Sequence, residues 1–228
     1  MLNPGLVIFD MDGLMFDTER LLLKHVIDAA ATLGQTITPD VYKGIIGSGG
    51  GNVKEVFNEH YNGDCPIEEA IEIVTNMAMD GMKKEIMTNG LPIKKGLVKL
   101  LDYLKEADIE CCIASSSPLI LVQTYLQLSG VAPYFSGIIS GDSVKETKPN
   151  PEIFLKALEQ FNVAPEDALV LEDSKNGITA AYKANIPSVC IPDLFVPDRE
   201  MIEQATLITS SLDNLINLID DGNIANCA

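Results

Sequence analysis

Short apolar runs alternate with stretches of helical periodicity along most of this chain, and this alternation predicts an α/β fold. The apolar runs predict strands over residues 6–9, 109–114, 136–140, 167–172, 188–191 and 206–208. The stretches between them predict helices over residues 96–107, 118–128, 151–161, 175–184 and 211–220. Because strands and helices alternate at this spacing, we predict a doubly wound parallel sheet, a Rossmann-like core with helices on both faces.

The alternation is interrupted after Asp17 by a segment that contains no predicted strand. Its helical spacing predicts helices over 18–33, 52–60 and 66–87, separated by glycine-containing stretches. We therefore expect an inserted all-helical cap domain formed by residues 18–88. Residues 1–17 and 89–228 would together form the α/β core domain.

Charge restricts the partners that this chain can have. The 228 residues include 16 basic and 33 acidic side chains, which gives a formal net charge of −17. Such a field repels phosphate backbones, so we expect no nucleic-acid partner. It also repels small anionic substrates, so any phosphate chemistry would need local cations or a metal, and we expect Mg²⁺.

The sequence indicates neither a membrane protein nor a disulfide-bonded one. No stretch reaches the ~18 consecutive apolar residues of a membrane span, and Asp10 and Asp12 interrupt the first apolar run. The five cysteines are odd in number and form no Cys-Xaa-Xaa-Cys pair. We expect reduced thiols, a cytoplasmic location and no contact with membranes.

The most informative stretch is LVIFDMDGLMFD, residues 6–17, in which an apolar run ends at Asp10 and a second carboxylate follows at Asp12. Ligands bind at the carboxyl ends of strands in open parallel sheets. Two carboxylates one residue apart can share a hard cation, and one can act as nucleophile or proton carrier. A solvated turn is the plainer alternative, and the apolar run before it makes that alternative less favourable.

A second predicted strand, 109–114, runs into Ser115, Ser116 and Ser117. Hydroxyls and backbone amides between a strand and a helix can bind an anion. Taken alone, three serines are more often a helix cap or a loop.

Two further strand ends offer charged residues. Lys148 precedes a proline, which restricts its backbone and projects its side chain from a fixed point. Glu172 and Asp173 end the run 167–172, where they could simply favour a helix N-terminus. If all these strands lie in one sheet, the lysine and the acidic pair should converge on Asp10.

In this order and spacing, the four clusters resemble the motifs of the haloacid dehalogenase superfamily of aspartate-nucleophile phosphotransferases. The phrases FDMDGLMFDTE, KPNPEIF and LEDSKNGI, with the helical insertion after Asp17, resemble its β-phosphoglucomutase-like branch. The resemblance covers the whole chain. It implies an enzyme that acts on small phosphomonoesters.

The resemblance also implies a role for each motif residue. Asp10 would be the catalytic nucleophile that forms an aspartyl-phosphate, and Asp12 would protonate the leaving oxygen and then deprotonate the attacking water. Magnesium would bind the Asp10 carboxylate, the Asp12 backbone carbonyl and the Asp173 carboxylate. Glu172 would assist at this metal site.

The same resemblance assigns substrate contacts. Ser115 and the backbone amide of Ser116 would hold phosphoryl oxygens, and Lys148 would neutralise both the phosphate and the nucleophile. The glycine-rich loop 46–52, which includes Gly47, lies where caps of this family carry a substrate-reading loop. A plain flexible connector is an equal alternative for this loop.

We therefore predict a Mg²⁺-dependent phosphatase that hydrolyses a small phosphorylated metabolite, expected to be a sugar phosphate, and we expect a monomer. A sugar-phosphate mutase is the alternative within the family. Such mutases carry a histidine a few residues after the position of Asp17 and an arginine in the cap loop, and neither is found at those positions here. A catalytically silent regulatory protein is a further alternative, which retention of the complete motif set makes less favourable.

Overall fold

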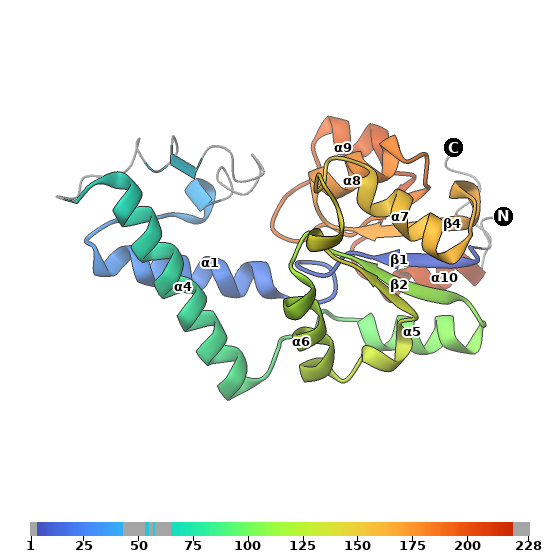
Figure 1. Cartoon of the computed structure of the whole chain (residues 1–228), viewed down its shortest axis with the longest axis horizontal. Helices are drawn as coiled ribbons and strands as arrows, with labels where there is room; N and C mark the ends of the chain where they lie inside the picture. The colour runs from blue at the N-terminus through green and yellow to red at the C-terminus, as the bar shows by residue number, and fades with distance from the viewer. Residues whose placement is uncertain (1–3, 43–52, 55–56, 58–64, 221–228) are drawn as a thin grey trace. The chain divides into compact units, whose positions relative to one another are not determined.

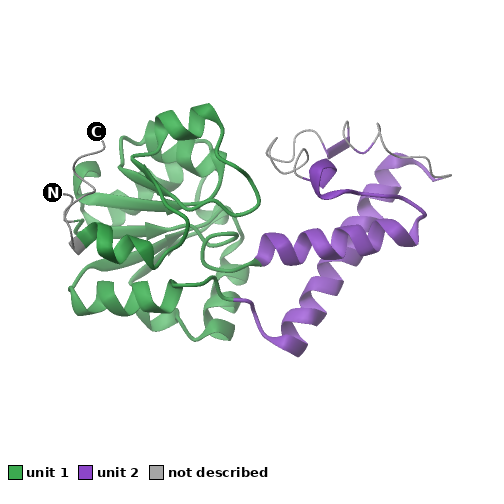
Figure 2. Cartoon of the chain, turned by 180° about the vertical axis from the view of Figure 1, so that it is seen from behind, with its two compact units in different colours: residues 1–17, 93–228 green, residues 18–92 purple. Residues whose placement is uncertain are grey.

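The computed structural model describes residues 4–42, 53–54, 57 and 65–220, and the chain forms two compact units (Figure 2). Unit 1 comprises residues 1–17 and 93–228, and unit 2 comprises residues 18–92. Most of the helix predicted over 52–60 lies outside the described residues.

A six-stranded parallel sheet forms the centre of unit 1, with the strand order β3-β2-β1-β4-β5-β6 (Figure 1). The strands are β1 (Leu6–Phe9), β2 (Glu110–Ala114), β3 (Gly137–Ile139), β4 (Ala168–Glu172), β5 (Ser188–Cys190) and β6 (Leu207–Ile208). All six lie where the apolar runs predict them. The predicted fold class, a doubly wound Rossmann-like core, is confirmed.

Helices pack on both faces of this sheet, with α7 and α8 on one face and α5 and α10 on the other (Figure 1). The helices of unit 1 are α5 (Leu97–Glu106), α6 (Leu119–Ser129), α7 (Glu152–Phe161), α8 (Lys175–Lys183), α9 (Arg199–Gln204) and α10 (Asn214–Asp220). Single 3₁₀ turns occur at η1 (Ala132–Tyr134), η2 (Gly141–Ser143) and η3 (Pro165–Asp167).

Helix α9 is the one described helix of unit 1 that the sequence pattern did not predict. It has six residues, and only Met201 among them is buried, so it is too short to show an apolar period. Its start is specified locally instead, because the Asp198 carboxylate accepts a hydrogen bond from the Met201 amide at 2.9 Å.

Unit 2 contains the helices α1 (Thr18–Thr32) and α4 (Ile67–Asn89), which pack against each other. Small buried residues permit their close approach, among them Ala30 on α1 and Ala78 on α4. Gly81 provides the space for the His25 ring, whose Nε2 lies 2.9 Å from a Glu85 carboxylate oxygen. Among the described residues, no helix has both the length and the apolar character needed to cross a membrane.

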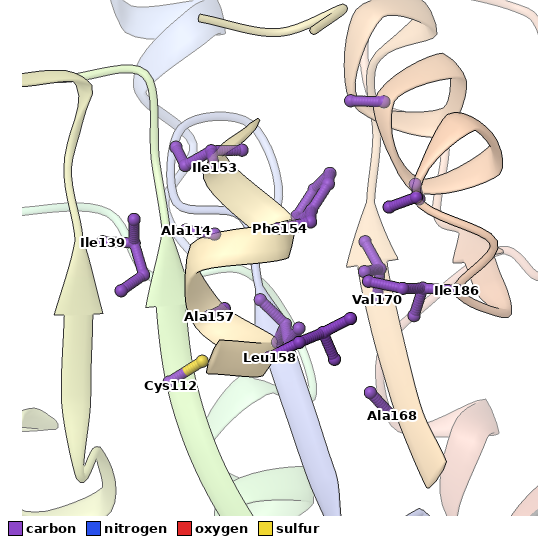
Figure 3. Close-up of a cluster of buried hydrophobic side chains, with 14 of the residues drawn as sticks. Cys112, Ala114, Ile139, Ile153, Phe154, Ala157, Leu158, Ala168, Val170 and Ile186 are labelled. Carbon is purple, nitrogen blue, oxygen red and sulfur yellow. The ribbon is translucent and has the colours of Figure 1, made fainter. Parts of the chain in front are cut away.

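Strand periodicity divides the core of unit 1 between the two faces of the sheet. Leu6 and Ile8 of β1 point toward α7 and α8, and the buried cluster on that face includes Val170 of β4 and Ile153 of α7 (Figure 3). The alternate β1 residues are also fully buried and face the opposite side. Burial of both faces is typical of a parallel strand covered by helices.

The contribution of this core can be tested on α7. Ile153 is fully buried, whereas Leu155 on the same helix is 46% exposed. We expect Ile153→Ala to lower the free energy of unfolding by about 2–5 kcal/mol, because it removes buried methylene groups and leaves a cavity. Leu155→Ala should change it by less than about 0.5 kcal/mol. Urea denaturation followed by circular dichroism measures both values, and similar losses in the two variants would contradict this packing.

Candidate active site

The candidate site is built at the carboxyl ends of three neighbouring strands. The sheet order places β1 between β2 and β4. The register pairs Phe9 of β1 with Ile113 of β2 and with Leu171 of β4, so Asp10 lies level with Glu172. In this strand order the direction of the crossover connections reverses beside β1, which is where such sheets bind ligands.

Lys148 reaches this point from the segment between β3 and α7. Its ammonium donates three hydrogen bonds, to Asp10 Oδ1 at 2.5 Å, to Glu172 Oε1 at 2.7 Å and to the Ala114 carbonyl at 2.9 Å. Its side chain is only 4% exposed, and the ammonium lies 5.0 Å from the centre of the Phe154 ring. The three ammonium hydrogens are therefore donated to acceptors from β2, β4 and the residue directly after β1.

Burial determines the electrostatics of this contact. It raises the pKa of Asp10 to about 8; Lys148 acts in the opposite direction, and the carboxylates of Glu172 and Asp12 add to the rise. Burial lowers the pKa of Lys148, but Asp10 and Glu172 outweigh it and hold that pKa above its usual value. The ammonium therefore stays charged at neutral pH, and further positive charge at the site would favour the ionised form of Asp10.

Glu172 is fixed from three sides. Its Oε1 accepts the hydrogen bond from Lys148, and its Oε2 accepts from the Ser174 amide at 2.8 Å and the Ser174 hydroxyl at 2.9 Å. A Cβ atom at Gly177 would overlap this carboxylate, so the helix start fits only with glycine there. Because both oxygens already accept hydrogen bonds, the geometry favours Glu172 as the group that holds Lys148.

A divalent cation fits the acidic group beside Lys148. Asp10, Glu172 and Asp173 each offer a carboxylate oxygen, and these oxygens lie within 4.8 Å of one another. The Asp173 carboxylate packs against Gly13, where φ is +85° and a Cβ atom would collide with it. Lys148 pairs with two of these carboxylates, those of Asp10 and Glu172, and carboxylate oxygens are ligands that Mg²⁺ prefers.

The second aspartate of the motif has a partner that sequence reasoning did not identify. The Ser117 hydroxyl donates a hydrogen bond to Asp12 Oδ2 at 2.8 Å, and the Ser117 amide donates to Ser115 Oγ at 3.1 Å. Ser115 is buried, whereas Ser116 is exposed. The triple serine was the available signal, but nothing in it indicates which hydroxyl faces Asp12.

The predicted residues that the structure describes divide into three groups by position. Asp10, Lys148 and Asp173 lie together with Glu172 in one cluster. Ser115 follows Ala114, whose carbonyl accepts from Lys148, and Ser116 adjoins it. Asp12 is hydrogen-bonded to Ser117, which lies in the segment that follows β2. Gly47 and the loop 46–52 lie outside the described residues.

The buried contact predicts a large effect on stability when its cation is removed. We expect Lys148→Met to lower the free energy of unfolding by about 3–5 kcal/mol at neutral pH, because two buried carboxylates lose their partner. Lys145→Met, which makes the same change at an exposed position of the same segment, should cost less than about 0.5 kcal/mol. Chemical denaturation tests both, and equal values would show that the ammonium does not hold the site together.

Comparisons with known proteins agree with this geometry. The sequence pattern of the haloacid dehalogenase-like hydrolase family matches residues 7–191. A phosphorylated carbohydrates phosphatase from Thermotoga maritima is 34% identical over 188 residues, covering 80% of this chain and 82% of that protein. Hexitol phosphatase B from Escherichia coli O157:H7 is 27% identical over 218 residues, covering 92% of each.

The solved structure of CbbY from Rhodobacter sphaeroides in complex with phosphate is also similar, with 28% identity, a TM-score of 0.69, and coverage of 93% of this chain and 96% of that one. The chain therefore belongs to the haloacid dehalogenase-like hydrolase family.

Proposed function

We propose that this protein is a Mg²⁺-dependent phosphatase that hydrolyses a small phosphomonoester through an aspartyl-phosphate on Asp10. The observation that carries the proposal is the buried ammonium of Lys148, 2.5 Å from Asp10 at the carboxyl ends of the central strands. A sugar phosphate is the expected substrate class, because the names of two relatives refer to phosphorylated carbohydrates and to hexitol phosphates.

In the first proposed step, a carboxylate oxygen of Asp10 attacks the phosphorus of the substrate. A bond forms between that oxygen and phosphorus, and the bond from phosphorus to the substrate oxygen breaks. The Ser115 hydroxyl and the Ser116 amide would bind phosphoryl oxygens. Lys148 would neutralise charge on both the phosphoryl group and Asp10, because its ammonium stays protonated when buried between carboxylates.

Asp12 is proposed to move the proton in both steps. It gives a proton to the leaving oxygen, which departs as an alcohol, and then takes a proton from the water that attacks the phosphorus. The bond between phosphorus and Asp10 breaks in that second step, and inorganic phosphate is released. The Ser117 hydroxyl supports this role, because its hydrogen bond to Oδ2 orients the Asp12 carboxylate.

The carboxylates of Asp10 and Asp173 and the backbone carbonyl of Asp12 would hold the metal, with Glu172 assisting through Lys148. When bound, Mg²⁺ supplies positive charge that offsets the negative charge of phosphate and nucleophile. The acidic cluster supports this proposal, since its three carboxylates each offer an oxygen within 4.8 Å of the others.

Unit 2 is proposed to act as the cap that excludes water and selects the substrate. The loop that includes Gly47 would contribute the specificity contacts. A screen of phosphorylated metabolites would identify the substrate, with isomerisation of β-glucose-1-phosphate included to detect mutase activity. We expect a small phosphorylated metabolite, no nucleic acid, a monomer and a cytoplasmic location.

Phosphate release from p-nitrophenyl phosphate tests the proposed activity. We expect turnover with Mg²⁺ and its loss after treatment with a chelator, with recovery when Mg²⁺ is added back. Asp10→Asn should lower kcat by about 10³-fold or more at saturating Mg²⁺, because an amide cannot replace the nucleophile.

The matched control for this assay is Asp167→Asn. Asp167 lies at an exposed position in η3, at the amino end of β4 and away from the site, so its replacement should leave kcat within about twofold of the wild type. Circular dichroism should show that both variants remain folded. Metal-independent turnover, or near-normal activity in Asp10→Asn, would contradict the proposed function.

A further inference from the structure

A second buried ion pair lies where the two chain segments of unit 1 lead toward unit 2. The Lys94 ammonium is 2.6 Å from Asp193 Oδ1 and 3.5 Å from Asp17 Oδ1. Asp17 ends the first segment of unit 1, Lys94 is the second residue of the other segment, and Asp193 follows β5. The side chain of Asp193 is 1% exposed and that of Lys94 is 21% exposed. The Asp193 end of this contact is therefore shielded from water, whereas the Asp17 side chain is 35% exposed, and the contact joins three separate parts of unit 1.

Backbone contacts connect the same lysine to the segment that includes Asp12. The Lys94 amide donates a hydrogen bond to the Met15 carbonyl at 2.9 Å, and Ile93 pairs with Phe16 in an antiparallel bridge. Phe16 in turn pairs with Asp12 in a parallel bridge. The position of Asp12 is thus linked to Lys94 through two residues of the intervening loop.

That loop is compact and makes its own hydrogen bonds. The amides of Met15 and Phe16 both donate to the Met11 carbonyl, at 2.9 and 3.2 Å, and the Gly13 amide donates to the Phe16 carbonyl at 2.9 Å. Met11, Met15 and Phe16 are fully buried. Because this loop packs as one body, a shift of its Phe16 end would also move the Asp12 end.

Removing the Lys94 side chain would disturb the contact between Asp193 and the segment that supports the 11–16 loop. The Asp193 carboxylate would lose its close cation while almost completely buried, so the Lys94 side of the contact would have to rearrange. A purely stabilising ion pair is the alternative interpretation. It does not account for the backbone links that run from Lys94 and Ile93 to Met15 and Phe16, and on to Asp12.

We propose that Lys94, through its ion pair with Asp193, is a positioning residue that holds the 11–16 loop so that Asp12 can protonate the leaving group. This inference rests on the proposed function, in which Asp12 is the proton donor. Lys94 acts through the loop, whereas Asp10, Asp12 and Lys148 would act on the reacting atoms.

The choice of leaving group separates this role from simple stabilisation. Phenoxide is a basic leaving group that needs a proton as the phosphorus–oxygen bond breaks, whereas 2,4-dinitrophenolate leaves readily without one. The value of kcat/KM reports transfer of the phosphoryl group to Asp10, before water attacks. A misplaced Asp12 therefore lowers kcat/KM for phenyl phosphate more than for 2,4-dinitrophenyl phosphate, whereas loss of folded protein lowers both equally.

The experiment measures kcat/KM for both esters at saturating Mg²⁺. We expect Lys94→Met to lower the value for phenyl phosphate by about tenfold and the value for 2,4-dinitrophenyl phosphate by less than about twofold. Asp12→Asn should show the same difference between the two esters, with a larger loss of kcat/KM for phenyl phosphate. Lys94→Arg should restore most of the loss, because a guanidinium also pairs with a carboxylate. Lys95→Met, an identical change at the exposed neighbouring position, should leave both values unchanged.

Equal losses for the two esters in Lys94→Met would overturn the positioning role. If that variant does not fold, Asp193→Asn provides the same comparison, because it removes the charge and keeps the shape of the side chain. A larger loss of kcat/KM for phenyl phosphate than for 2,4-dinitrophenyl phosphate in Asp193→Asn would support the proposal, and equal losses would overturn it. A wild-type chain that hydrolyses neither ester would instead refute the proposed function itself.

Discussion

The site depends on one buried contact, in which the Lys148 ammonium lies between the carboxylates of Asp10 and Glu172. A charge in this position is costly unless its partners are held at hydrogen-bonding distance. The sheet meets that requirement by bringing β1, β2 and β4 together, since β2 and β4 each supply one acceptor to the ammonium and the residue directly after β1 supplies the third. The packing of the central strands therefore also holds the charged groups of the candidate site in place. A shift between these strands would separate charges that are nearly inaccessible to water.

Close backbone approach is the second requirement, and two glycines satisfy it. Gly177 leaves room for the Glu172 carboxylate at the start of α8, and Gly13 leaves room for the Asp173 carboxylate beside the loop that follows β1. Each glycine lies in a phrase that resembles a family motif, yet neither is a ligand or a catalytic group. Their contribution is space, which lets two acidic side chains lie close to Asp10 without distorting the backbone.

The sequence predicted the parts of this structure that local pattern encodes. Apolar runs predicted all six strands, and the residues at their carboxyl ends or directly after them included Asp10, Glu172 and Asp173, which the structure brings together with Lys148. Contacts between distant residues left no such signal. Ser117 and Asp12 are 105 positions apart, and Lys94 and Asp193 are 99 apart, so no periodicity or spacing relates them. Helix α9 was missed because a six-residue helix with one buried side chain has no apolar period.

The central claim is that Asp10 becomes covalently phosphorylated during turnover, and rapid quenching in acid followed by mass spectrometry of proteolytic fragments tests it most directly. With a hydrolysed phosphomonoester and Mg²⁺ present, the account predicts that a fraction of the fragment containing Asp10 gains the mass of one phosphoryl group. This gain should disappear once the substrate is exhausted. Steady turnover with no phosphoryl group on that fragment at any quench time, or with the group on a different residue, would contradict the account.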